Sequence, residues 1–194
     1  MGLEREWRAS KGTGAKPYRQ GDLDGLCGLY AIINALRRAT RREPLEEDAW
    51  PWLFAELLRK ADRSLGAVHA VTCGIDTKPL WRLAKYAVGV LAAEYDLGAR
   101  VTRPLKGKRK LTVPKVVDAV ANVLARDDTG VLVGFGGPLD HWTVVTSVSP
   151  LHLSLFDSSG RSRVRQDRCA LASKRDQPGL HILQPAAIFA FSLR

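Results

Sequence analysis

The hydrophobic pattern of this chain changes its period once, near residue 129, and this change constrains the fold more than any other feature. Before it, apolar residues recur at helical spacing, as Leu29, Ile32, Ile33 and Leu36 do. After it, apolar and polar residues alternate, as in strands that are buried on one face. Because helices come first and antiparallel strands follow, we expect an α+β protein. A helical N-terminal lobe should pack on an antiparallel β-sheet lobe.

The pattern also predicts where the individual elements lie. We expect one helix from Cys27 onward and another from Thr112 onward. Residues 45–62 should form one or two helices, with Pro51 starting the second. A further helix should span 77–95, with Asp76 as its cap. We expect strands over 131–135, over 141–148 and 152–157 as a hairpin, at Ile182 and over 187–193.

We interpret residues 1–194 as a single domain. Its helical lobe should span about 23–126 and its strand lobe about 130–194. Residues 1–22 contain glycine, proline and charged residues without periodicity, so we expect an extended lead-in there. No apolar run approaches the ~20 residues that span a bilayer, and the N-terminus has no apolar segment typical of a secretory signal. We therefore expect a soluble protein that stays in the cytoplasm.

The chain has a formal net charge of +10, to which two basic runs, 106–110 and 161–165, contribute. Such a surface favours acidic partners and speeds their association. Aromatic residues are not interleaved with the runs, as they are in nucleic-acid stacking platforms. We therefore interpret the runs as solvated loops and expect a protein or peptide partner rather than nucleic acid.

Three cysteines, Cys27, Cys73 and Cys169, are too few and too scattered for a disulfide framework. No closely spaced Cys/His pairs indicate a metal site, and no glycine-rich loop has the ending that a phosphate-binding loop needs. We expect no metal and no cofactor. A lone cysteine with a histidine far downstream is instead a pattern of catalytic thiols. Cys73 and Cys169 lack such a setting, so we expect structural roles for them.

Cys27, His141 and Asp157 have the positions that thiol catalysis requires. A helix start and a nearby imidazolium both lower the pKa of a thiol, and Cys27 stands at an expected helix start. His141 opens a strand after a glycine-rich turn, and Asp157 lies sixteen residues later on the return strand. A short hairpin brings two such positions side by side. Asp157 would then fix the tautomer and the orientation of the His141 ring.

Neighbouring residues suit the same interpretation. Gly25 and Gly28 bracket Cys27 and would leave room for a substrate backbone. Ala31 and Ala35 share the helix face of Cys27 and would let another part of the fold pack closely. The backbone N–H of Cys27 and the side-chain amide of Gln20, seven residues before it, would stabilise an oxyanion.

Simpler interpretations exist for each of these residues. Free cysteine often behaves as a small buried hydrophobe, and His141 would then merely begin a strand. Gln20 would be a loop residue that faces water. The segment from Asp157 to Gly160 would be a turn that Asp157 caps.

Two blocks of the chain, together about a third of its length, resemble papain-like cysteine peptidases. The stretch from Gln20 to Ala31, QGDLDGLCGLYA, resembles their glutamine-to-cysteine segment. DHWTVV at 140–145 and LFD at 155–157 are similar to the histidine hairpin of the bacteriocin-leader (double-glycine) peptidases of that superfamily. The resemblance implies a papain-like fold and catalytic roles for Cys27, His141, Asp157 and Gln20. The specific substrate of those peptidases is not carried over to this chain. The expected substrate is a protein or peptide that is acidic or has a small-residue (Gly-Gly-like) cleavage site.

The expected reaction is acyl transfer from a peptide or isopeptide carbonyl to Cys27, followed by hydrolysis. Three alternatives remain open. The same triad would also serve an acyltransferase or a deamidase. The cleft would otherwise be a non-catalytic protein-binding module. A nucleic-acid binder rests on the charge alone, and its affinity would fall steeply with salt.

Overall fold

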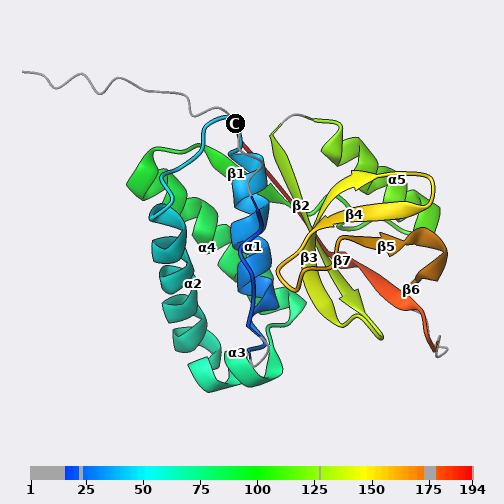
Figure 1. The fold of residues 1–194 in the computed structure, drawn as a ribbon, viewed down its shortest axis with the longest axis horizontal. Coiled ribbons are helices and arrows are strands. Elements are labelled where there is room, and N and C mark those ends of the chain that lie inside the picture. The colour runs from blue at the N-terminus through cyan, green and yellow to red at the C-terminus, as the bar shows by residue number, and fades with distance from the viewer. Residues whose placement is uncertain (1–15, 22–23, 127, 173–177, 194) are drawn as a thin grey trace, which may run out of the picture.

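The computed structural model describes residues 16–21, 24–126, 128–172 and 178–193, so most of the expected lead-in lies outside the described residues. Figure 1 shows a group of helices on one side of a sheet and one further helix on the other. The described residues therefore form an α+β protein, as the change of period predicts. The sheet is antiparallel except where β6 pairs with β7.

Four helices of the described chain form the helical side. They are α1 (Cys27–Ala39), α2 (Ala49–Leu65), α3 (Ala67–Cys73) and α4 (Thr77–Tyr95). Residues 45–62 differ from the expectation, because a single helix begins at Ala49 and contains Pro51 in its first turn, where a missing N–H is tolerated. No helix in the described ranges has both the length and the apolar character that crossing a bilayer requires.

Seven strands of the described chain form one sheet in the order β1-β7-β2-β3-β4-β5, with β6 beside β7. They are β1 (Ala99–Thr102), β2 (Thr129–Gly136), β3 (His141–Val148), β4 (His152–Phe156), β5 (Arg163–Arg165), β6 (Cys169–Leu171) and β7 (His181–Leu193). The two strand-like segments expected near the end of the chain are thus parts of one long strand, β7.

β3 and β4 form the hairpin that the alternating pattern predicts. Val144 pairs with Phe156 and Val145 with Leu155, and the register shifts beyond Val145. Because Phe156 lies opposite Val144, the residue after β4 lies beside the first residues of β3. The hairpin thereby sets the spacing of His141 and Asp157.

Helices cover the sheet on both faces (Figure 1). α1 and α4 pack on one face, in a core that includes Leu132, Val144 and Phe189. α5 (Val113–Leu124) packs on the other face through Val116 and Val120. Two elements between residues 23 and 126 therefore belong with the sheet: β1, which pairs with β7, and α5.

α1 approaches β2 so closely that backbone meets backbone. A Cβ atom added to Gly130 would lie 2.9 Å from the Cα of Ala35 and closer still to its carbonyl oxygen. Ala31 and Ala35 are both buried. The small residues of α1 therefore allow close packing, as expected, and they hold the helix that begins at Cys27 firmly against the sheet.

Candidate active site

Cys27 is the first residue of α1, and a turn held by Asp24 leads into it. The Asp24 carboxylate accepts hydrogen bonds from the backbone N–H of Gly21 and of Leu26, both at 3.0 Å. Leu26 occupies the N-cap position but has no side chain that can cap, so Asp24 satisfies an amide at the helix start instead. Sequence reasoning missed this role, although aspartate just before a helix is a recognised signal.

The glycines beside Cys27 serve packing rather than substrate entry, which corrects the expectation. The Gly25 N–H donates to the carbonyl of Val71 at 2.6 Å, and a Cβ on Gly25 would lie 2.8 Å from that oxygen. A Cβ on Gly28 would lie 2.8 Å from the side chain of Leu80. The space expected for a substrate is thus occupied by α3 and α4.

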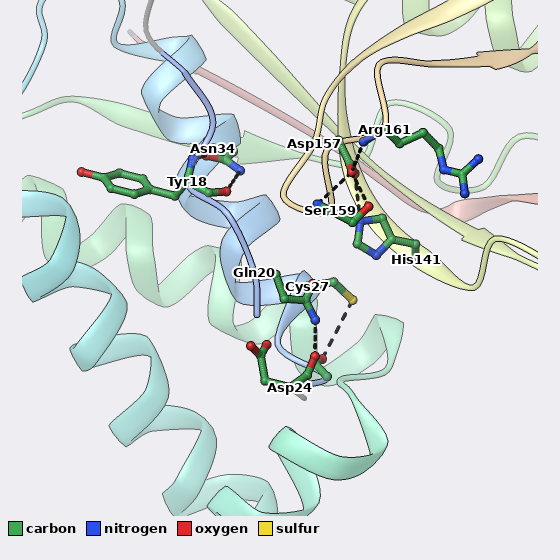
Figure 2. Close-up of polar contacts among 10 residues, drawn as sticks. Tyr18, Gln20, Asp24, Cys27, Asn34, His141, Asp157, Ser159 and Arg161 are labelled. Carbon is green, nitrogen blue, oxygen red and sulfur yellow. Dashed lines mark hydrogen bonds and ion pairs between the residues drawn. The ribbon is translucent and has the colours of Figure 1, made fainter. Parts of the chain in front are cut away.

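His141 and Asp157 are in direct contact, as the hairpin argument predicts. The Nε2 atom of His141 lies 2.8 Å from Oδ2 of Asp157. Only 11% of the His141 side chain and none of the Asp157 side chain is exposed. Because Nε2 is engaged by the carboxylate, Nδ1 is the ring nitrogen left for Cys27, whose sulfur lies near the ring in Figure 2.

The electrostatics of the site favour a charged histidine. Burial alone would lower the pKa of His141, but hydrogen bonds and Coulombic attraction from Asp157 and Cys27 outweigh it and raise that pKa to about 9. Burial likewise acts to raise the pKa of Asp157, but hydrogen bonds from His141 and Ser159 hold it well below its ordinary range. The site is therefore suited to a positively charged His141 ring between the Asp157 carboxylate and Cys27.

Asp157 uses its second oxygen to cap a turn, as the simpler interpretation of this residue predicts, while its first oxygen contacts His141. Its Oδ1 accepts from the backbone N–H and the hydroxyl of Ser159, at 2.9 and 2.6 Å, and from the N–H of Arg161 at 3.1 Å. These bonds, drawn in Figure 2, fix the carboxylate before it meets the ring. Because the turn donors hold Oδ1, the carboxylate cannot rotate away from the ring, and Oδ2 fixes the orientation of His141.

Gln20 is tied to both sides of the site. Its backbone N–H donates to the carbonyl of Ser158 at 3.0 Å, next to Asp157 in the chain. Its side-chain Nε2 donates to the carbonyl of Asp24, in the turn that leads into Cys27. One N–H of that amide remains for another acceptor. Gln20 is not among the residues that line the cavity at Cys27, so its oxyanion role stays a prediction.

The segment that carries Gln20 is anchored along α1 by a side chain that sequence reasoning missed. Asn34 is buried, and its Oδ1 accepts from the N–H of Tyr18 at 2.9 Å while its Nδ2 donates to the carbonyl of the same residue at 3.2 Å. Figure 2 shows this pair about two turns along α1 from Cys27. Asn34 therefore positions the approach to Gln20.

A cavity of about 210 Å³ opens beside Cys27 and His141. Its wall combines the connection between α3 and α4 with the end of β2 and the start of β3. The indole Nε1–H of Trp142 donates to the carbonyl of Ile75 at 2.9 Å and ties these two sides together. The cavity thus lies where the helical layer meets the sheet.

The cavity contains further groups that sequence reasoning assigned elsewhere or missed. Asp76 stands at the N-cap of α4 but makes no capping hydrogen bond, so its expected role is corrected. Asp76 instead lines the cavity, together with Asp140, Cys73 and Gln184. Cys169 lies elsewhere and is buried, and burial with the charge of Asp167 raises its pKa to about 11.

Comparisons of the chain with protein-family models, curated proteins and solved structures find no match. Across the described ranges, no three His, Cys, Asp or Glu side chains gather into a group that could hold a metal ion. What the site can do chemically follows from its own groups: a thiol at a helix start, a buried and polarised histidine, and a cavity beside both.

Proposed function

We propose that this chain is a papain-like cysteine hydrolase that cleaves a peptide or isopeptide bond. The observation that carries the proposal is the buried contact at 2.8 Å between Nε2 of His141 and Oδ2 of Asp157, on a ring whose other nitrogen is left for Cys27. A thiol, a base and a group that orients the base are the parts that nucleophilic catalysis needs.

In the proposed reaction, the Cys27 thiolate attacks the substrate carbonyl carbon and the carbonyl oxygen becomes an oxyanion. The backbone N–H of Cys27 and the free N–H of Gln20 donate to that oxygen. His141 then gives its proton to the leaving amine, and a thioester remains on Cys27. His141 next takes a proton from water while the oxygen attacks the thioester carbon. The C–S bond then breaks, which releases the carboxylic acid and restores the Cys27 thiolate beside protonated His141.

The cavity supports a small residue next to the scissile bond. Its volume of about 210 Å³ is below the ~300–1,000 Å³ of pockets that enclose drug-sized ligands. Asp76 and Asp140 are exposed and line it, so an acidic side chain inside the cavity would be repelled. The acidic character that the net charge favours therefore belongs to parts of the substrate outside the cavity.

The test is cleavage of a peptide library that samples small, basic and acidic residues on both sides of the scissile bond, with products identified by mass spectrometry. We expect turnover by the wild type, none by Cys27→Ala or His141→Ala, and retained turnover by Cys73→Ser, which removes the other thiol of the cavity. Product formation that depends on an added amine acceptor would reveal a transferase, and a gain of one mass unit at glutamine would reveal a deamidase. Equal cleavage by Cys27→Ala would refute the proposal.

A further inference from the structure

A second and much larger cavity, of about 840 Å³, lies on the α5 side of the sheet. It is bounded by β1, the end of β7, α5 and the connection 103–112. It shares no lining residue with the cavity at Cys27. Its volume falls within the ~300–1,000 Å³ of small-molecule sites, and the proposed hydrolase mechanism makes no use of it.

The lining of this cavity is strongly basic. Five cationic residues contribute to it against one acidic residue, Asp118: Arg100, Lys108, Arg109, Lys115 and Arg126. All five are exposed, and within the described ranges none of them forms an ion pair. The cavity therefore carries an excess of positive charge that a bound anion would neutralise.

The cations converge on the cavity from three separate elements. Arg100 comes from β1, and its Nε donates to the hydroxyl of Ser192 at 2.9 Å, which fixes its direction without neutralising it. Lys115 and Arg126 lie along and just beyond α5. Cations on three elements that surround one cavity suit a compact polyanion. They suit an extended acidic peptide less well, because its charged side chains are spread along its length.

The basic run 106–110 is folded onto the cavity, so it is more than the solvated loop expected from its sequence. Leu105 is buried and anchors the run in the core below. The N–H of Lys108 donates to the carbonyl of Leu105 at 3.2 Å, and Gly107 takes a φ of 77°, which favours glycine. This turn brings Lys108 and Arg109 to the cavity wall.

Between the cations the wall includes partly exposed apolar residues, Leu111, Val123 and Leu193. Phe191 is the aromatic residue of the lining and is fully buried, so no stacking platform for a nucleic-acid strand is presented. We propose that this cavity binds a small molecule that carries a polyphosphate group on an apolar or aromatic body. A nucleoside triphosphate is the simplest representative of that class.

The proposal is tested by calorimetric titration of the full chain with ATP, inorganic triphosphate and adenosine. We expect ATP to bind, triphosphate to compete with it, and adenosine alone to bind far more weakly. The Lys115→Ala/Arg126→Ala variant should lose about tenfold or more in ATP affinity, because phosphate contacts dominate such binding. The matched control Lys78→Ala/Arg82→Ala removes two exposed cations from α4 and should change the affinity less than about twofold.

Circular dichroism melts of each variant establish that it is folded. If the α5 variant does not fold, Lys108→Ala/Arg109→Ala removes two cations from the connection and should show the same loss. Absence of ATP and triphosphate binding, or equal losses in the α5 and α4 variants, would overturn the proposal. So would tight binding of a twelve-nucleotide single strand by a chain that binds neither ATP nor triphosphate.

Discussion

Asp157 divides its two carboxylate oxygens between chemistry and structure. Oδ2 meets the ring of His141, while Oδ1 accepts three hydrogen bonds from Ser159 and Arg161. Asparagine has a single acceptor oxygen, and its NH₂ group would face either the ring N–H or the turn donors. A substitution here should therefore affect turnover and stability together.

We predict that Asp157→Asn lowers turnover by roughly tenfold to a hundredfold without abolishing it. This loss is at or below the ~10²–10⁴-fold that a general acid–base group itself contributes, because Asp157 acts through His141. The loss is limited because the amide oxygen of asparagine can still accept the ring N–H. Asp157→Ala should be more damaging. Both should also lose about 1 kcal/mol or more of unfolding free energy, as for a lost cap.

The control for this prediction is Ser159→Ala, which removes only a hydroxyl donor to Oδ1. It should cost stability and leave the rate per folded molecule nearly unchanged. Thermal melts and rates per folded molecule on all three variants separate the two roles. Full specific activity of folded Asp157→Ala would remove Asp157 from the catalytic group.

Gln20 is the side-chain amide predicted to stabilise the oxyanion, and Gln184 is a second amide that lines the cavity. Gln20→Ala should lower turnover by roughly 10²-fold, the effect of removing one oxyanion donor. Its stability should change little, because the bond from its backbone N–H to Ser158 persists. Gln184→Ala should cause a clearly smaller loss of turnover. The reverse order of losses would assign the oxyanion donor to Gln184.

The positions of the candidate residues were predictable where they depend on residues that are near in the chain. Cys27 follows from a helix start, and the contact of His141 with Asp157 follows from one hairpin. Asn34 and Trp142 were not predictable, because each bonds a backbone group that no periodicity marks. The carbonyl that Trp142 meets lies 67 residues away.

At the scale of elements, the contact between α1 and β2 decides where Cys27 sits relative to the strands that carry His141. This contact depends on Gly130, whose Cα faces the backbone of Ala35 without an intervening side chain. Backbone cannot yield as the end of a flexible side chain can. Any side chain at residue 130 would therefore push α1 away from the sheet.

We predict that Gly130→Ala destabilises the fold by about 1–3 kcal/mol, as overpacking of a core does, and that it slows turnover per folded molecule by displacing Cys27. The matched control is Gly89→Ala in α4, where an added Cβ meets nothing within 4 Å. That change should be neutral or stabilising by about 0.5–1 kcal/mol, because alanine favours helix. Urea unfolding and rates on both variants check the prediction. Equal stability of the two variants would contradict it.

The elements that sequence reasoning located well have their own strong periodicity or a clear start. α4 spans Thr77–Tyr95 and β3 spans His141–Val148, as predicted. α3 and β1 were not anticipated, because each is too short to show a period. β1 exists through its pairing with β7, in which Ala99 lies opposite Leu193, and no local pattern encodes such a distant partner.

At the scale of the whole molecule, the two ionised partners in the site link stability to pH. The pKa of His141 is raised on folding from 6.5 to about 9. The charged ring therefore contributes fully to the free energy of unfolding below pH 6.5, and this contribution is lost as the pH rises through 9. The pKa of Asp157 is lowered on folding. Its contribution is complete above its unfolded value of 3.8 and is lost as pH falls below that.

We therefore predict that the stability difference between wild type and Asp157→Ala is largest between pH 4 and 6.5. The difference should shrink toward pH 3, where the carboxyl of the unfolded chain takes up a proton. It should also shrink above pH 9, where the His141 ring of the folded protein loses its proton. Urea unfolding of both proteins across this range measures the difference. A difference that stays constant from pH 3 to pH 10 would show that the pair contributes no ionic stabilisation.

The central claim is that Cys27 is a nucleophile activated by His141, and one labelling measurement tests it most directly. Electrophilic peptide probes, including ones ending in Gly-Gly, are added to the folded chain at mildly acidic pH, and the modified residue is mapped by mass spectrometry. We predict an adduct on Cys27 well before Cys73 or Cys169, with labelling of Cys27 reduced by about tenfold or more in His141→Ala. Equal labelling of Cys27 and Cys73, or labelling of Cys27 that His141→Ala leaves unchanged, would contradict it.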